Sequence, residues 1–91
     1  MAYELPLPEP LGSQGWKVKI FDKERAEQPH ATVIKKTRRW RIALRSVCFL
    51  DDDPPPGEVP KEVLDAISAG IGELVRQWDR MYPHNPVSSE T

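Results

Sequence analysis

Residues 39–45 read Arg-Trp-Arg-Ile-Ala-Leu-Arg, and the alternation of charged and apolar side chains in this stretch decides the fold class. Successive side chains of a β-strand point to opposite faces of a sheet. Trp40, Ile42 and Leu44 would therefore share a buried face, while the arginines share the opposite face. The stretch predicts a strand at 39–45 with one apolar and one basic side.

Two further strands are predicted upstream of this one. Residues 16–21 read Trp-Lys-Val-Lys-Ile-Phe, and the same alternation places the lysines opposite the apolar side chains. Residues 30–36 contain the β-branched run Thr-Val-Ile, which favours a strand without deciding which of its sides faces the core. The residues between 35 and 38 would form a short reversal. We therefore expect an antiparallel hairpin in the middle of the chain.

The apolar pattern changes after Leu44. Its phase slips by one residue, to Val47 and Phe49, as happens at a β-bulge or at a turn near Arg45. We expect a short fourth strand, or a bulged continuation of the third, at 47–50.

A different period begins after the next group of prolines. Between about 60 and 82 the apolar residues recur at steps of three and four, which predicts one long amphipathic helix with Pro60 at its first position. Gly70 and Gly72 are unusual there, since each costs about 1 kcal/mol relative to alanine inside a helix. With the nearby alanines they form a patch of small residues, which allows a strand or a second copy of the helix to approach closely.

These elements predict one two-layer α+β domain at 16–82. A three- to four-stranded antiparallel sheet (about 16–21, 30–36, 39–45 and 47–50) would be covered on its apolar face by the helix at 60–82. The proline-rich residues 1–15 predict an extended or disordered arm, and residues 83–91 a disordered tail. The expected core is modest for a monomer, so a homodimer is one of the expected partnerships.

Composition and charge narrow the class of protein further. The chain has 91 residues, ten of them proline, and 38% of its residues are apolar, which fits one small folded domain. The formal net charge of −1 conceals two opposed halves: residues 17–45 hold ten Lys or Arg against three acidic residues, and residues 46–91 hold three against nine. The composition excludes collagen, a disulfide scaffold and a tandem repeat array. The excess of Lys and Arg in residues 17–45 points to a basic surface on the strands.

Cys48 and the apolar runs bear on the compartment. Cys48 is the only cysteine, so no intramolecular disulfide can form, and its apolar neighbours predict a buried thiol. The longest apolar run, at 47–50, is far shorter than the roughly 20 residues that cross a bilayer or the roughly 7 to 15 of a signal-peptide core. We therefore expect a cytoplasmic protein without a membrane partner.

Eight cations would gather on one side of the predicted sheet. They stand at alternating strand positions or at the tip of the hairpin: Lys17, Lys19, Lys35, Lys36, Arg38, Arg39, Arg41 and Arg45. Such a surface binds phosphate groups. Stacking of bases also needs exposed aromatic rings, and Phe21 is the only obvious one on that side. One alternative is a solvated face whose charges keep the protein soluble and protect the edges of the sheet from pairing. The other is a surface for an acidic protein partner.

Metal-binding and catalytic residues are less well marked. Carboxylates cluster at 51–53 with Glu58, but the prolines at 54–56 break the ligand spacing of an EF-hand, so we expect a solvated loop and neither a metal nor another cofactor. His30 and His84 are the candidate catalytic residues, as general acid and base, should the helix bring them together. Neither has a partner at motif spacing, and a structural or merely exposed role is the alternative.

The strand that begins Pro29-His30, the strand 39–44 and the helix end at 74–82 resemble a family of small uncharacterised bacterial proteins, catalogued as a domain of unknown function. In that family a strand opening Pro-His-x-His precedes a sheet and a C-terminal helix with a Trp-containing end. The resemblance covers about residues 16–82. His30 matches the first histidine and Trp78 the helix tryptophan, whereas Thr32 stands in place of the second histidine, which argues against a two-histidine site.

Members of that family are often encoded beside a small partner in toxin–antitoxin pairs, so the resemblance implies a cognate protein partner and a role with RNA. From the residues themselves we expect a small non-enzymatic module that engages RNA, DNA or an acidic protein partner through its basic face. One alternative is a small ribonuclease-like toxin of a toxin–antitoxin pair. Another is a module for protein interaction or dimerisation through the glycine patch of the helix.

Overall fold

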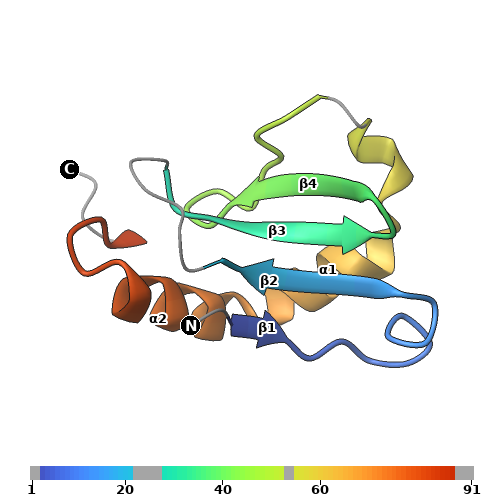
Figure 1. Cartoon of the computed structure of the whole chain (residues 1–91), viewed down its shortest axis with the longest axis horizontal. Helices are drawn as coiled ribbons and strands as arrows, with labels where there is room; N and C mark the ends of the chain where they lie inside the picture. The colour runs from blue at the N-terminus through green and yellow to red at the C-terminus, as the bar shows by residue number, and fades with distance from the viewer. Residues whose placement is uncertain (1–2, 22–27, 53–54, 88–91) are drawn as a thin grey trace.

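The computed structural model describes residues 3–21, 28–52 and 55–87 and arranges them in two layers (Figure 1). An antiparallel sheet with strand order β1-β2-β3-β4 forms one layer, and the helices lie behind it. The elements are β1 (Tyr3–Leu5), β2 (Trp16–Ile20), β3 (His30–Lys35), β4 (Arg38–Ala43), the 3-10 helix η1 (Pro56–Glu58), α1 (Lys61–Ala69) and α2 (Ile71–Met81). The predicted α+β class with an antiparallel sheet is confirmed.

The core lies between the sheet and the helices. Trp16, Val18 and Ile20 of β2 are buried, and the strand register places Val33 opposite Val18 and Trp40 opposite Val33. The helices contribute further buried residues to the same cluster: Val63, Ile67, Leu74 and Trp78. The register also settles the inward side of β3, which the sequence left open.

The helical region is two helices rather than the one long helix that the apolar period predicts. α1 ends at Ala69 and α2 begins at Ile71, because Gly70 leaves the helical conformation with φ −99° and ψ 13°. A Cβ atom at Gly70 would lie 2.8 Å from Leu5 Cδ1, so β1 occupies the space that a side chain there would need. The predicted close approach of a strand to the glycine patch is thus made by β1.

The fourth strand of the sheet is β1, not the predicted strand at 47–50. After β4 the chain reverses tightly, with Val47 at φ 55°, and forms only an isolated bridge between Ile42 and Phe49. This reversal is the turn that the slip in apolar phase predicts. The expectation of a buried Cys48 is wrong, because the reversal leaves its side chain exposed.

The structure describes residues 3–15 and 83–87 of the two terminal segments, and both of these parts contribute to the core. In the N-terminal segment, for which we expect an extended or disordered arm, β1 pairs with β2, and Leu5 and Leu11 are buried in the core. In the C-terminal segment the structure describes residues 83–87, and Val87 is buried. Trp78 Nε1 donates a hydrogen bond to the Asn85 carbonyl at 2.7 Å, which holds this segment against α2. Each segment carries apolar side chains that fill gaps at the margin of the core.

Candidate functional site

The face of the sheet opposite the helices carries two rows of side chains that cross β2, β3 and β4. The first row is Lys17, Ile34 and Arg39. The second row is Lys19, Thr32 and Arg41. Neighbouring strands lie about 4.8 Å apart, so each row sets two cations roughly 10 Å apart on either side of an uncharged residue. We call these six residues, together with Phe21 at the end of β2, the outer face.

The cations of the outer face differ in how they are paired. Lys17 and Arg39 are exposed, and neither has a carboxylate within ion-pair distance among the residues that the structure describes. Lys19 Nζ lies 4.0 Å from Glu4 Oε1, at the outer limit of an ion pair. Lys17 and Arg39 are therefore the cations most open to an external anion.

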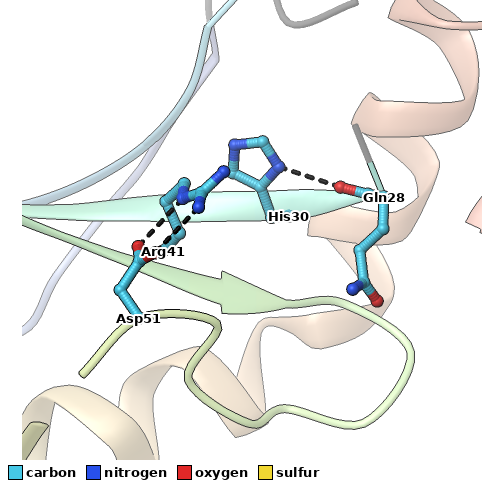
Figure 2. A network of polar contacts seen from close by, with 4 residues as sticks. All are labelled: Gln28, His30, Arg41 and Asp51. Carbon is cyan, nitrogen blue, oxygen red and sulfur yellow. Dashed lines mark hydrogen bonds and ion pairs between the residues drawn. The ribbon is translucent and has the colours of Figure 1, made fainter. Parts of the chain in front are cut away.

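Arg41 forms a two-pronged ion pair with Asp51, which Figure 2 shows from close by. Its Nε donates to Oδ2 at 2.9 Å and its Nη2 to Oδ1 at 2.7 Å. These hydrogen bonds from Arg41 hold the pKa of Asp51 below its ordinary value, against the smaller opposing effect of partial burial. Asp51 is consequently a carboxylate anion at neutral pH, and its geometry is fixed from one side.

A hollow of about 280 Å³ lies on the outer face, lined by Phe21, Thr32, Arg39, Arg41 and Asp51. The guanidinium carbon of Arg39 stands 5.5 Å from the centroid of the Phe21 ring, within the range of a cation–π contact. Thr32 is buried beneath these longer side chains. The hollow thus combines an aromatic ring, two guanidinium groups and a carboxylate.

The structure brings four of the eight predicted binding cations together on the outer face and places the hairpin cations elsewhere. Lys35 is opposite Trp16 in the register, on the inner side, with its Nζ 4.8 Å from the Trp16 ring centroid. Arg38 is opposite Lys35 and forms an ion pair with Glu58. Lys36 lies in the turn between β3 and β4, with φ 56°.

Arg45 lies beyond the end of β4 and does not belong to the outer face either. Its Nε donates to the Val87 carbonyl at 2.7 Å and its Nη2 to the Pro86 carbonyl at 3.2 Å. The turn that follows Leu44 removes Arg45 from the alternation of the strand. These hydrogen bonds from its guanidinium hold the C-terminal segment against the sheet.

The two candidate histidines lie in different environments. His30 is 1% exposed, its Nδ1 donates to the Gln28 carbonyl at 2.9 Å (Figure 2), and its ring centroid is 5.5 Å from that of Trp78. His84 is exposed in the segment after α2. A general acid or base must reach its substrate, and in this structure only His84 has a ring that is open to solvent.

Clustered metal ligands are not found in the described part of the chain: it has no group of three or more His, Cys, Asp or Glu side chains placed to hold a metal ion. Within the acidic loop Asp51 is paired with Arg41, Asp52 is exposed, and Asp53 lies outside the described residues.

Sequence reasoning missed two residues of the hollow, Thr32 and Asp51. Thr32 becomes an outer-face residue only when β3 is aligned against β2, where it stands opposite Lys19. Asp51 returns to β4 because the reversal after Leu44 pairs the Leu50 amide with the Arg41 carbonyl at 2.8 Å. The sequence does carry a signal for Asp51, because an acidic run begins there soon after the slip in apolar phase. A chain that turns back along β4 brings the start of that run beside the arginines of the strand.

Comparison of the chain with protein-family models, with curated proteins and with solved structures gave no match. No helix within the described residues has the length and apolar character that crossing a membrane requires. The chemistry of the outer face is therefore the basis for an inference about function.

Proposed function

We propose that the outer face binds the phosphate backbone of single-stranded nucleic acid, and that the protein is a non-enzymatic binding module of the cytoplasm. The observation that carries this proposal is the placement of four cations in two parallel rows across the sheet, on β2 and β4 at either side of β3. Arginine and lysine side chains in such an array replace the counterions of phosphate groups. Lys17 and Arg39 are the principal contacts, because they are exposed and unpaired among the described residues.

Phe21 favours nucleic acid over an acidic protein partner. Its half-buried ring lies on the same face as the cations and contacts the Arg39 guanidinium. Proteins that bind single strands combine a basic track with aromatic rings on which bases stack. An acidic protein partner would use the cations without needing the ring.

The test is the salt dependence of binding to a labelled single strand of about eight nucleotides, followed by fluorescence anisotropy between about 50 and 200 mM salt. Four phosphate contacts predict that log K falls with log salt at a slope of about −2.8 for a single strand. Replacing Lys17 and Arg39 by glutamine should reduce the slope to about −1.4. Lys61→Gln is the matched control, since the Lys61 side chain on α1 is 84% exposed and far from the outer face in sequence and layer.

Each outcome bears on the proposal. A slope that the double variant leaves unchanged, or an equal loss with Lys61→Gln, would contradict it. Equal binding of an oligo-glutamate peptide of matched charge would instead identify the acidic protein partner.

The ribonuclease-like alternative would use a histidine, and only His84 is exposed in the structure. The implied toxin–antitoxin partner stays a prediction. RNA cleavage that disappears in His84→Ala, with binding retained, would replace the binding module by an enzyme.

A further inference from the structure

The two rows of the outer face differ in whether the protein's own acids already contact their cations. In the second row Arg41 is held by Asp51, and Lys19 Nζ lies 4.0 Å from Glu4 Oε1. Neither cation of the first row has a carboxylate within ion-pair distance among the residues that the structure describes. The contact between Arg41 and Asp51 is the closer of the two, and it occupies a cation that the proposed function assigns to a phosphate.

Asp51 presents to Arg41 the same pair of acceptors that a phosphate group would present. Its two oxygens accept from Nε at 2.9 Å and from Nη2 at 2.7 Å (Figure 2), the parallel arrangement in which arginine holds carboxylates and phosphates alike. A phosphate on that edge of the guanidinium needs the positions that the carboxylate oxygens hold. Asp51 also lines the hollow together with Arg39, so its negative charge stands among the cations that a bound strand would contact.

The pair can open without loss of the pairing between strands. The side chains of Arg41 and Asp51 are 38% and 29% exposed, and ion pairs at such exposed positions contribute little to stability. The returning chain is held one residue earlier, where the Leu50 amide donates to the Arg41 carbonyl at 2.8 Å. Asp51 itself lies outside the strands, so rotation about its side-chain bonds is enough to take the carboxylate off the guanidinium.

We infer that Asp51 is an internal competitor of the nucleic-acid backbone: its carboxylate closes Arg41 in the free protein, and a phosphate group replaces it when a single strand binds. The first row, which is open, receives the strand, and Arg41 joins the contact by exchange of one anion for another. The opposite role for Asp51 is to hold Arg41 in position for a phosphate bound elsewhere on the guanidinium. The two roles differ in sign, because removal of a competitor strengthens binding and removal of a positioning group weakens it.

This inference rests on the proposed function, and its test uses the full chain with a labelled single strand of about eight nucleotides, followed by anisotropy at about pH 7 between about 50 and 200 mM salt. Asp51→Asn should bind about two- to fivefold more tightly than wild type, since an exposed ion pair opposes its own opening by a factor of that size. The salt slope should stay near that of wild type, because the number of phosphates contacted is the same.

Two controls separate the exchange from a general effect of charge. Asp52→Asn removes the same charge from the next residue, which is exposed and outside the hollow. It should raise the affinity by less than about 1.5-fold at about 200 mM salt, where charges more than about 8 Å apart are largely screened. In an Arg41→Gln background, Asp51→Asn should give no larger gain than Asp52→Asn, because no guanidinium is left to release.

A measurement on the wild-type protein keeps the inference testable should Asp51→Asn fail to fold. The carboxyl carbon of Asp51 has a nuclear magnetic resonance signal that reports its hydrogen bonds. Addition of the single strand should move this signal towards its position in Arg41→Gln, in which the two hydrogen bonds from Arg41 are absent. A signal that stays in place while the strand is bound overturns the exchange.

The results distinguish failure of this inference from failure of the proposed function. Wild-type binding with the expected salt slope, together with equal or weaker binding by Asp51→Asn, overturns the role of Asp51 and leaves the proposed function standing. A gain of the same size in Asp52→Asn, or one that persists in the Arg41→Gln background, does so too. Failure of wild type and Asp51→Asn alike to bind at low salt overturns both.

Discussion

Leu5 of β1 packs against Gly70 so closely that a Cβ atom at Gly70 would lie 2.8 Å from Leu5 Cδ1. Leu5 is buried, and Gly70 is the junction between α1 and α2. The contact joins the first strand of the sheet to the middle of the helical layer. It ties the N-terminal segment to the core and sets where the helix breaks.

Gly70→Ala should therefore destabilise the protein by about 1 kcal/mol. An added methyl group must displace the buried Leu5 side chain, and overpacking of this kind costs roughly 1 to 3 kcal/mol. This cost exceeds the stabilisation that the better helix propensity of alanine provides. Unfolding in urea measures the change.

The matched variant is Gly72→Ala, two residues further on. Gly72 is exposed, and the nearest atom to an added Cβ is Arg76 Nη1 at 4.0 Å, so alanine should stabilise α2 by about 0.5 to 1 kcal/mol. Changes of the same sign at both glycines would refute the role assigned to Leu5.

Arg39 and Arg45 should separate binding from stability. Arg39→Gln should weaken binding to a single strand and change the free energy of unfolding by less than about 0.5 kcal/mol, because its side chain is exposed and unpaired among the described residues. Arg45→Gln should do the reverse, with a loss of about 1 kcal/mol, since it removes charge-assisted hydrogen bonds to the carbonyls of Pro86 and Val87. Anisotropy and urea unfolding on the same two variants check both effects.

The Arg41–Asp51 pair predicts a dependence of stability on pH. Because Arg41 lowers the pKa of Asp51 in the folded protein, the pair stabilises the fold at pH values above the ordinary pKa of 3.8, and this contribution disappears as the pH falls from there through the lowered pKa. With both side chains partly exposed, it amounts to about 0.5 to 1 kcal/mol.

Wild type should thus exceed Asp51→Asn in stability at about pH 7, and this advantage should shrink as the pH falls below the ordinary pKa of 3.8. Asp65→Asn breaks the exposed pair with Lys61 and serves as the control, with little change at either pH. A difference between wild type and Asp51→Asn that is constant across this range would rule out the pair as its source.

Cys48 should react with a thiol reagent in the folded protein, without denaturant. Its side chain is exposed, and the one hydrogen bond that this side chain makes among the described residues, from Sγ to the Ser46 carbonyl at 3.5 Å, is a weak contact. Absorbance of the released reagent measures the reaction. Labelling that requires urea would place Cys48 in the core, as the sequence led us to expect.

The parts of the fold that the sequence predicts are those with local periodicity. The alternation in residues 16–20 places Trp16, Val18 and Ile20 in the core, and the alternation after Arg39 does the same for Trp40 and Ile42. The period of the helical region likewise identifies its buried residues. In each of these segments the period of the backbone matches the period of the buried side chains over a short stretch. The pattern can therefore be recognised without knowledge of distant contacts.

The parts of the fold that the sequence does not predict depend on contacts between residues far apart in the chain. Leu5 lies among prolines that favour an open arm, and its partners Val18 and Gly70 are far along the chain. The same is true of the outer face, where Thr32 and Asp51 reach the arginines only through register and through the turn after Leu44. A charge pattern identified the basic side of the strands, but it could not tell which cations would be turned inward or tied to carbonyls.

The two margins of the sheet bear on how a partner can approach. β1 has three residues and is followed by Pro6, whose ring nitrogen has no hydrogen to donate, and beyond β4 the chain folds back to bridge Ile42 with Phe49. Such short and interrupted margins give an incoming strand little backbone to pair with. Strand addition of the kind that joins sheets edge to edge is thereby discouraged, and the broad side of the sheet that the helices leave uncovered is the surface through which we propose that the protein binds.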